Sequence, residues 1–458
     1  MSPFWKSARK SARKSARKSG WIWGAAFALA FAVPAISGTE AGSSGDELRT
    51  LRVDRFLAES MGAADLDVWI LLTREGHLDP LSRDFGFHIG RGALIFVREG
   101  ERAVSRSAVV SSLDLVPLRQ SGIYERLVPV ERTQSFETVL TDTLAEIFEG
   151  RNIERIGVNM SESQGLADGL SASSWQLLRR ALGPKLRDRL VSSERTVLSF
   201  RSKKLPQEIE LYRKATKITH EILHEAMTDG FLKPGVTTQQ DMRDHVQALA
   251  RKRGFDETAW EKDACPGVYS GLFTDLSHAA PDQRTIDPGD ILWIDFGIKY
   301  DGYATDMIRA AYVLKPGETK APPWVQKMFD TARKANDAAA AALVPGRRGY
   351  EVDAVARRVV TEAGYPEFFH STGHPVGFAV HGAGPSLGPK GPRYGSAVEL
   401  PLEAGQIFAI EPSVMQPRED LGGSFIINIE EEVLVTPDGG EVLSERQTEL
   451  YLIAPPTP

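Results

Sequence analysis

Cysteine is nearly absent from this sequence. Its 458 residues include only Cys265, so no disulfide can form within the chain, and a zinc site built from several thiolates is excluded. Long apolar runs are also missing, because the stretch 21–35 is shorter than the roughly 20 residues that a membrane-spanning helix needs. With 42% hydrophobic and 25% charged residues, the composition is typical of a globular protein of two or three domains.

The first 37 residues have the layout of a secretory signal peptide. Residues 6–19 repeat a basic Lys-Ser-Ala-Arg motif without one acid, the apolar run follows, and Ala35-Ile-Ser37 offers small residues at a cleavage site. The sequence therefore predicts an exported protein, periplasmic or secreted, that loses residues 1–37 and begins with a flexible leader over residues 38–47. No stable membrane span is expected after cleavage; an uncleaved N-terminal anchor is the alternative.

Acidic residues outnumber basic ones in the predicted mature chain. Removing the seven lysines and arginines of the signal segment leaves 48 of 55 basic residues against 61 acidic ones, a formal charge of −13. An acidic surface disfavours nucleic acid and anionic lipid as partners, so we expect neither.

Residues 291–306 place two carboxylates eleven residues apart in a predicted strand pair. Asp295 and Asp306 lie among apolar residues, and Asp301-Gly302 between them is typical of a hairpin turn. Such a hairpin would bring the two aspartates side by side on one face. Because two like charges in an apolar sheet are costly without a cation between them, we predict a divalent metal site.

Three further candidate ligands follow along the chain. His374 lies in Gly-His-Pro-Val-Gly, Glu411 in Ile-Glu-Pro, and Glu430 in Ile-Glu before a Val-Leu-Val-Thr strand. One imidazole with several carboxylates suits two Mn²⁺, Co²⁺ or Zn²⁺ ions bridged by carboxylates and a water. We favour Mn²⁺ because the donor set is rich in oxygen.

Together these motifs resemble the metallopeptidase family with the pita-bread fold, which includes methionine aminopeptidase, Xaa-Pro aminopeptidase, prolidase and creatinase. The resemblance covers roughly residues 45–455 and includes His381, a second histidine seven residues after His374. It implies an α/β (α+β) protein with a creatinase-type N-terminal domain over residues 48–200 and a pita-bread catalytic domain over residues 205–455. It also implies a homodimer.

The resemblance assigns a role to each predicted ligand. Asp295 would chelate one ion and His374 the other, and Asp306 and Glu430 would bridge both. Glu411 would bind metal, take a proton from the attacking water and pass it to the leaving amine.

Three more histidines are implied in substrate binding. His278 would contact the scissile region of the peptide, and His381 would hydrogen-bond the substrate carbonyl or the tetrahedral intermediate. His370 matches a position of the Xaa-Pro branch; the alternative is a histidine that only supports the ligands.

Departures from the family's pattern concern substrate choice. Gly382 follows His381 where the family often has an acid, and Asn428 precedes Ile429-Glu430 where the prolyl branch usually has arginine. The missing arginine removes a fixed cation beside the five predicted metal ligands, which together form the predicted cage. One reason to expect a proline preference is lost with it. Glu431 and Glu432 are additional acids.

Helical periodicity predicts two helix pairs in the second half of the chain. The first pair consists of residues 206–228 and a helix that ends at Lys252. The second pair consists of residues 324–342 and 350–363. In each pair a Pro-Gly turn connects the two helices. The pairs lie about 110 residues apart, a faint internal repeat. His220 and His224 are interpreted as residues on a solvated helix face.

Two functions of different classes fit this sequence. The first is an exported two-metal aminopeptidase that removes the N-terminal residue from peptides, with Xaa-Pro bonds favoured and the choice between dipeptides and longer peptides open. The second is a metal-free creatinase-like hydrolase or a non-catalytic pita-bread protein that binds peptide. The complete set of five ligands favours the first.

Overall fold

A computed structural model of the chain describes residues 45–86, 90–274 and 281–454. The predicted signal peptide lies outside these ranges and stays a prediction. Within the described residues, no helix is long and apolar enough to cross a lipid bilayer.

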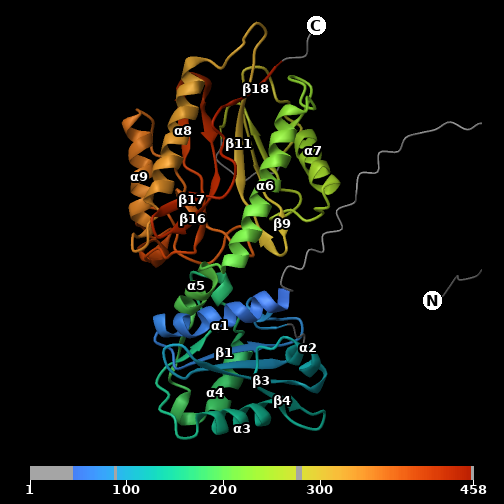
Figure 1. Ribbon diagram of the computed structural model, residues 1–458, viewed down its shortest axis with the longest axis vertical. Helices are drawn as coiled ribbons and strands as arrows, with labels where there is room; N and C mark the ends of the chain where they lie inside the picture. The colour runs from blue at the N-terminus through green and yellow to red at the C-terminus, as the bar shows by residue number, and fades with distance from the viewer. Residues whose placement is uncertain (1–44, 87–89, 275–280, 455–458) are drawn as a thin grey trace, which may run out of the picture. The chain divides into compact units, whose positions relative to one another are not determined.

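A six-stranded mixed sheet forms the centre of the N-terminal part, with strand order β4-β3-β2-β1-β5-β6 (Figure 1). β1 pairs antiparallel with β2 and parallel with β5. Every residue of β1 is buried, as expected for a strand whose two faces are both covered. The strands are β1 Val68–Thr73, β2 Gly92–Arg98, β3 Val104–Ser111, β4 Arg126–Val130, β5 Ile156–Val158 and β6 Leu190–Ser192.

Helices cover both faces of this sheet. Side chains alternate between the two faces of a strand, so Trp69 and Leu71 pack with α1 and α5, whereas Val68 and Ile70 pack with α3 and α4. The helices are α1 Gly45–Ala63, α2 Leu115–Gln120, α3 Phe136–Phe148, α4 Ala172–Leu186 and α5 Glu194–Ser202.

The C-terminal part contains two four-stranded sheets, β18-β11-β8-β7 and β12-β13-β16-β17, and two short ribbons, β9–β10 and β14–β15. The first sheet and its ribbon comprise β7 Gly267–Ser270, β8 Ile291–Phe296, β9 Lys299–Tyr300, β10 Tyr303–Ala304, β11 Met307–Val313 and β18 Tyr451–Ile453. The second set comprises β12 Gly373–Pro375, β13 Ile407–Ile410, β14 Ser413–Arg418, β15 Gly423–Asn428, β16 Glu431–Thr436 and β17 Gly439–Val442.

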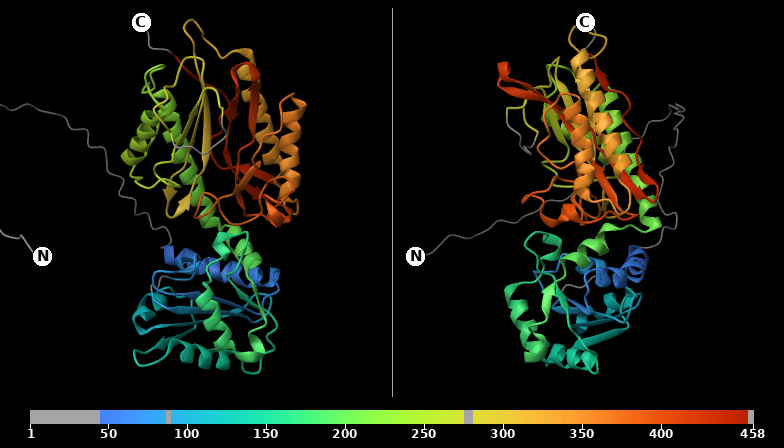
Figure 2. Two further views of the ribbon diagram at one scale, coloured as in Figure 1. Left: turned by 180° about the vertical axis from the view of Figure 1, so that it is seen from behind. Right: turned by 90° about the vertical axis from the view of Figure 1, so that its left-hand side faces the viewer.

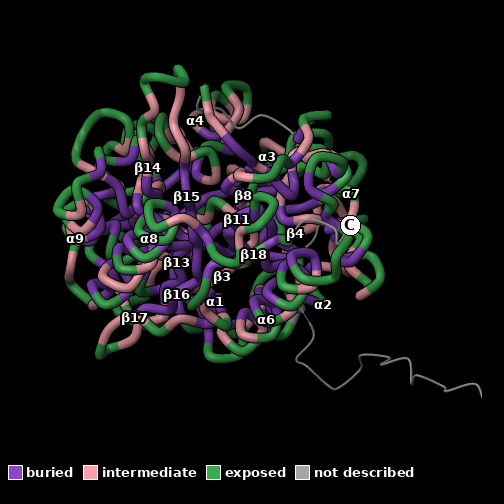
Figure 3. Tube along the Cα trace, turned by 90° about the horizontal axis from the view of Figure 1, so that it is seen from above, coloured by how far each residue is buried: buried purple, intermediate pink, exposed green. Residues whose placement is uncertain are grey.

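Two helix pairs pack on these sheets (Figure 2). Apolar side chains of α6 (Pro206–Thr228) and α7 (Gln239–Lys252) pack against β8 and β11. Those of α8 (Pro323–Ala342) and α9 (Gly349–Glu362) pack against β13 and β16. The four predicted helices are therefore confirmed within a residue or two, and each half of the predicted internal repeat is one helix pair with one sheet. Figure 3 shows that the central strands β8, β11, β13 and β16 are largely buried.

The first helix, α1, is the largest element that the sequence did not predict. It begins at Gly45, inside the segment predicted as a flexible leader. Its buried face contains Val53, Phe56 and Leu57, but also Arg52, whose side chain is only 3% exposed. A charged residue inside the apolar stripe hides the helical period, which explains why the pattern was missed.

Arg52 is buried because it has several acceptors. Its guanidinium donates to Glu208 on α6 at 2.7 Å, to the carbonyl of Phe200 at 2.6 Å and to the carbonyl of Lys203 at 3.0 Å. Glu208, fully buried, also accepts from the hydroxyl of Tyr303 on β10. This network ties α1 to the helix and the hairpin that border the candidate site.

We expect Arg52→Met to destabilise the protein strongly. The substitution leaves the Glu208 carboxylate buried without its cation, a change that costs about 3–5 kcal/mol. Arg55→Met on the same helix is the control, because its ion pair with Glu59 is exposed and contributes about 0–1 kcal/mol. Urea unfolding measures both; equal losses of free energy would contradict the importance of the buried network.

Candidate metal centre

Asp295 and Asp306 enter the site from neighbouring strands. Asp295 lies on β8, and Asp306 immediately precedes β11. The predicted hairpin turn forms between them: Asp301 and Gly302 both have positive φ, 47° and 84°. The register is the one that this turn sets: Tyr300 pairs with Tyr303, and Asp295 pairs with Ile308, two residues beyond Asp306. Residues two apart share a face, so the two aspartates meet diagonally on one face of the sheet.

The remaining three candidate ligands come from the second sheet. His374 lies on β12, Glu411 directly follows β13, and Glu430 directly precedes β16. β12 approaches β13 closely at Gly373, where a Cβ atom would lie 2.1 Å from the carbonyl oxygen of Ala409. Glycine before His374 is therefore required by this strand pairing.

The imidazole of His374 faces three carboxylates. Its Nε2 lies 3.5 Å from Asp306 Oδ2, 3.7 Å from Glu411 Oε1 and 4.0 Å from Glu430 Oε1. Its Nδ1 lies 3.4 Å from the carbonyl oxygen of Pro375, an acceptor, so Nδ1 carries the proton and the Nε2 lone pair points at the carboxylate oxygens. The Nε2 lone pair and these carboxylate oxygens are all hydrogen-bond acceptors, so a cation between them is needed to offset their repulsion.

Burial shifts the ionisation of every group in this cluster. It raises the pKa of Asp295 to about 7 and, together with the charge of Asp295, the pKa of Glu411 to about 8. The pKa values of Asp306 and Glu430 are raised well above their usual range by burial and by the neighbouring carboxylates. Burial also lowers the pKa of His374 to about 3, which keeps its imidazole neutral.

These residues fit a divalent metal. Atoms of Asp306, His374 and Glu430 all lie within 4.8 Å of one another, as ligands of one ion must. Asp295 Oδ1 is buried without a hydrogen-bond partner among the described residues, so an oxygen ligand is available there too. One imidazole and four carboxylates form a donor set suited to Mn²⁺, Co²⁺ or Zn²⁺.

A cavity of about 420 Å³ opens onto the cluster. One wall is aromatic: the rings of Tyr269 and Trp293 stack at 4.0 Å, and Phe273 lies beside both. Asp295, His374 and Glu411 line its floor, and a single arginine, Arg393, is the one Lys or Arg among the described residues that line it. The cavity is thus largely apolar with a few convergent polar groups, as small-molecule and peptide sites are.

Two of the three predicted substrate histidines line this cavity. His370 Nε2 lies 2.8 Å from the hydroxyl of Ser413, and its Nδ1 lies 2.7 Å from the carbonyl of Ser371. The ring of His381 packs edge-on against that of His374, with centroids 4.5 Å apart. His278 lies outside the described residues. The structure therefore brings together all five predicted ligands with His370 and His381.

Sequence reasoning missed the charged groups behind the ligands. Arg309, three residues after Asp306, is fully buried on β11 and pairs with Glu431 at 3.0 Å. An arginine inside an otherwise apolar strand was the available signal. His220 was also misjudged: it is 8% exposed and packs beside Arg309, so it does not lie on a solvated helix face.

Comparison with known proteins identifies a family for this chain. Residues 210–437 match metallopeptidase family M24. An uncharacterised peptidase of Bacillus subtilis, YqhT, is 28% identical over 315 residues, which are 69% of this chain and 79% of that protein. The Xaa-Pro dipeptidase of Pyrococcus furiosus is 26% identical over 330 residues, 71% of this chain and 82% of that protein.

Solved structures share the fold. A Xaa-Pro dipeptidase from Bacillus anthracis superposes with a TM-score of 0.66 at 22% identity, over 88% of this chain and 99% of the other. The dipeptidase PepE from Mycobacterium ulcerans gives the same TM-score and identity over 90% of this chain and 100% of the other. The predicted fold class, an N-terminal α/β domain followed by a pita-bread domain, is confirmed. With its motifs, its geometry and these matches in agreement, the chain belongs to the metallopeptidase family M24.

Proposed function

We propose that this protein is an exported two-metal peptidase that hydrolyses Xaa-Pro bonds, with dipeptides as its preferred substrates. The observation that carries the proposal is the meeting of four carboxylates and one neutral imidazole at the floor of a peptide-sized cavity. The named relatives that act on Xaa-Pro dipeptides support the substrate class. Export is supported by the basic repeat and apolar run of residues 1–37.

The cage residues would hold the cations, and the surrounding groups would handle the protons and the peptide. Divalent cations in this cage would supply Lewis acidity and lower the pKa of a water. Glu411, which lines the cavity beside the other ligands, is placed to accept a proton from that water and to pass it to the leaving amine. His381 faces the same cavity and can donate to the scissile carbonyl oxygen, whereas both ring nitrogens of His370 already bond to Ser371 and Ser413.

Arg393 supports the preference for dipeptides. Its guanidinium donates to the carbonyl of Phe369 at 3.1 Å, which holds it at the side of the cavity, and the residue is otherwise exposed. A dipeptide bound with its scissile bond at the cage has its C-terminal carboxylate one residue away. A cation at the cavity wall would recognise that carboxylate, whereas a longer peptide places no charge there.

We expect Asp306→Ala and Glu430→Ala to lower kcat on a Xaa-Pro dipeptide by at least about 10³-fold, because each removes a ligand of the cage and with it several kcal/mol of transition-state stabilisation. The assay compares Mn²⁺-loaded wild type and variants on a Xaa-Pro dipeptide, a Xaa-Pro tripeptide and a Met-Ala peptide. Chelator treatment of the wild type should abolish activity. Either variant retaining full activity with stoichiometric metal would refute the assignment.

Arg393→Met should raise KM for a Xaa-Pro dipeptide about 10- to 100-fold, the loss expected for a hydrogen bond to a charged group. The same dipeptide with an amidated C-terminus is the control, because it carries no carboxylate for the arginine to bind. Steady-state kinetics on the two substrates provide the measurement. An equal change in KM for both would show that Arg393 does not recognise the carboxylate.

Metal binding should release protons, and fewer of them at high pH. In the metal-free protein Asp295 and Glu411 hold protons below their raised pKa values of about 7 and 8, and a cation displaces these protons. We expect these two groups to release about 1.6 more protons per chain at pH 6.5 than at pH 9, and a metal affinity that rises across this window. His374, already neutral throughout it, contributes none.

Calorimetric titration with Mn²⁺ in buffers of different ionisation enthalpy measures this release. Proton release that did not change between pH 6.5 and pH 9 would contradict binding at this cluster.

A further inference from the structure

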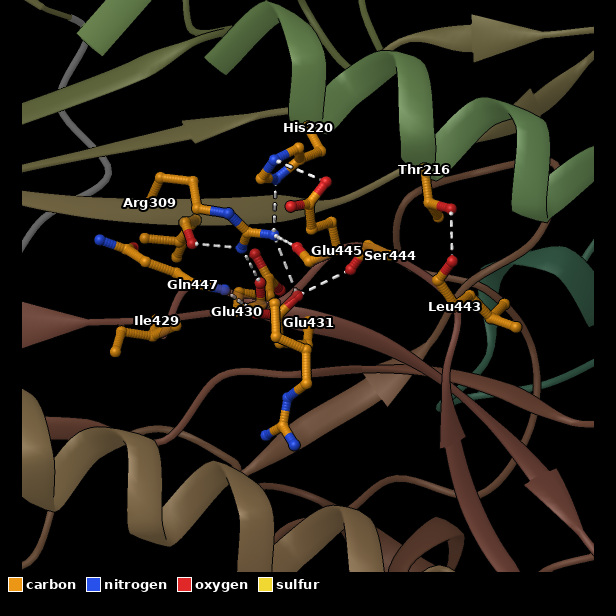
Figure 4. Close-up of polar contacts among 12 residues, drawn as sticks. Thr216, His220, Arg309, Ile429, Glu430, Glu431, Leu443, Ser444, Glu445 and Gln447 are labelled. Atoms are coloured by element: carbon orange, nitrogen blue, oxygen red, sulfur yellow. Dashed lines mark hydrogen bonds and ion pairs between the residues drawn. The ribbon is translucent and has the colours of Figure 1, made fainter. Parts of the chain in front are cut away.

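Arg309 reaches from the strand of one candidate ligand to the backbone of another. It lies on β11, three residues after Asp306, and one arm of its guanidinium donates to the carbonyl oxygen of Glu430 at 2.9 Å. The other arm donates to Glu431 Oε2 at 3.0 Å and to the carbonyl oxygen of Glu445 at 2.8 Å (Figure 4). Arg309 therefore holds the peptide unit that carries the Glu430 side chain.

Glu432 makes the reciprocal contact, from the segment of Glu430 to the backbone of Asp306. It lies on β16, two residues after Glu430, and its Oε1 accepts from the backbone N–H of Asp306 at 2.7 Å. The two segments also contact each other directly through the backbone, because the N–H of Glu430 donates to the carbonyl oxygen of Ile308 at 3.3 Å. Each ligand-bearing segment thus supplies one side chain that fixes the backbone of the other.

These contacts join two separate sheets. β11 belongs to the sheet β18-β11-β8-β7, and β16 belongs to β12-β13-β16-β17. No strand ladder connects them within the described residues, so ladder hydrogen bonds do not set the distance between Asp306 and Glu430. The reciprocal side-chain contacts, with the backbone hydrogen bond from Glu430 to Ile308, connect the two segments instead.

The clasp is made of buried charges with buried partners. Arg309, Glu431 and Glu432 are at most 2% exposed. Glu431 also accepts from Ser444 Oγ at 2.7 Å and from the backbone N–H of Gln447 at 3.1 Å. Burial raises the pKa of Glu432 to about 8, and the hydrogen bond from the Asp306 N–H and the charge of Lys204, which is 5% exposed, oppose that rise.

Burying several ions costs several kcal/mol each and gives little net stability, so stability alone does not explain these residues. Apolar side chains would pack the two sheets at lower cost. Charged groups additionally fix the geometry of the contact, because a charge-assisted hydrogen bond holds a backbone group at one distance and angle.

We propose that Arg309 and Glu432 are positioning residues, which form a reciprocal clasp that holds Asp306 and Glu430 at the separation the metal ions require. The clasp rests on the metal centre of the proposed function, and it explains the two extra acids after Glu430: Glu431 anchors Arg309, and Glu432 anchors Asp306. Neither residue touches the cavity or the substrate, so their effect passes through the ligands alone.

The test compares Glu432→Gln with Glu432→Leu in the full chain. Both variants remove the charge and leave Lys204 equally uncompensated, but only glutamine keeps an oxygen that accepts from the Asp306 N–H. We expect Glu432→Gln to bind Mn²⁺ within about threefold of wild type and Glu432→Leu to bind it about 10- to 100-fold more weakly, the usual effect of removing a partner of a metal ligand. Competition with a chromogenic chelator measures the affinity without any activity assay.

Arg309→Lys provides a second comparison that keeps the buried charge. Lysine lacks the planar fork that reaches Glu430 and Glu431 together, so we expect about a tenfold loss of Mn²⁺ affinity. Arg253→Lys is the matched control, because Arg253 pairs with Glu225 on α6 and contacts none of the cage residues. Thermal unfolding of the metal-free variants shows whether an affinity loss merely follows a loss of stability.

The possible outcomes distinguish a failure of the proposed clasp from a failure of the proposed metal centre. If wild type does not bind Mn²⁺, the proposed metal centre and the clasp both fail. If wild type binds it but the glutamine and leucine variants bind equally well, the clasp fails and the metal centre stands. Should the leucine variant not fold, the Arg309→Lys and Arg253→Lys pair decides by the same measurement, and equal affinities in that pair would overturn the proposal.

Discussion

Repulsion among four clustered carboxylates is the constraint on which the rest of this structure depends. Asp295, Asp306, Glu411 and Glu430 share one pocket with a neutral imidazole. Burial raises the pKa of all four, and neighbouring carboxylates raise it further at Asp306, Glu411 and Glu430. Protons can relieve this repulsion, but only divalent cations relieve it and also bind every acceptor that faces the centre. The cluster is therefore a poor stabiliser of the fold and a good binder of metal.

The fold separates the ligands in sequence and gathers them in space. One sheet provides Asp295 and Asp306, the other provides His374, Glu411 and Glu430, and each sheet packs against its own helix pair. The distances between ligands of different sheets therefore depend on how firmly the two sheets are connected. Beside the ligands, buried charged side chains form part of that connection, which accounts for ionic groups in a region that apolar residues could fill.

Much of this site is predictable from the sequence, because ligand motifs are local. Each of the five ligands lies in a short pattern of glycine, proline and apolar residues, and the catalytic helices show clear apolar periods. The groups that support the ligands are not local: Arg309 and Glu431 are 122 residues apart, and Arg52 and Glu208 are 156 apart. Pairing over such distances leaves no local pattern, so α1 and the environment of His220 were missed or wrong.

The central claim is that cations hold this cluster together, and locating the cations tests it most directly. Crystals of the protein grown with Mn²⁺ would be measured above and below the manganese absorption edge. The account predicts two anomalous peaks between the carboxylates of Asp295, Asp306, Glu411 and Glu430 and the imidazole of His374. A well-ordered cluster without an anomalous peak, or manganese bound only elsewhere on the molecule, would contradict it.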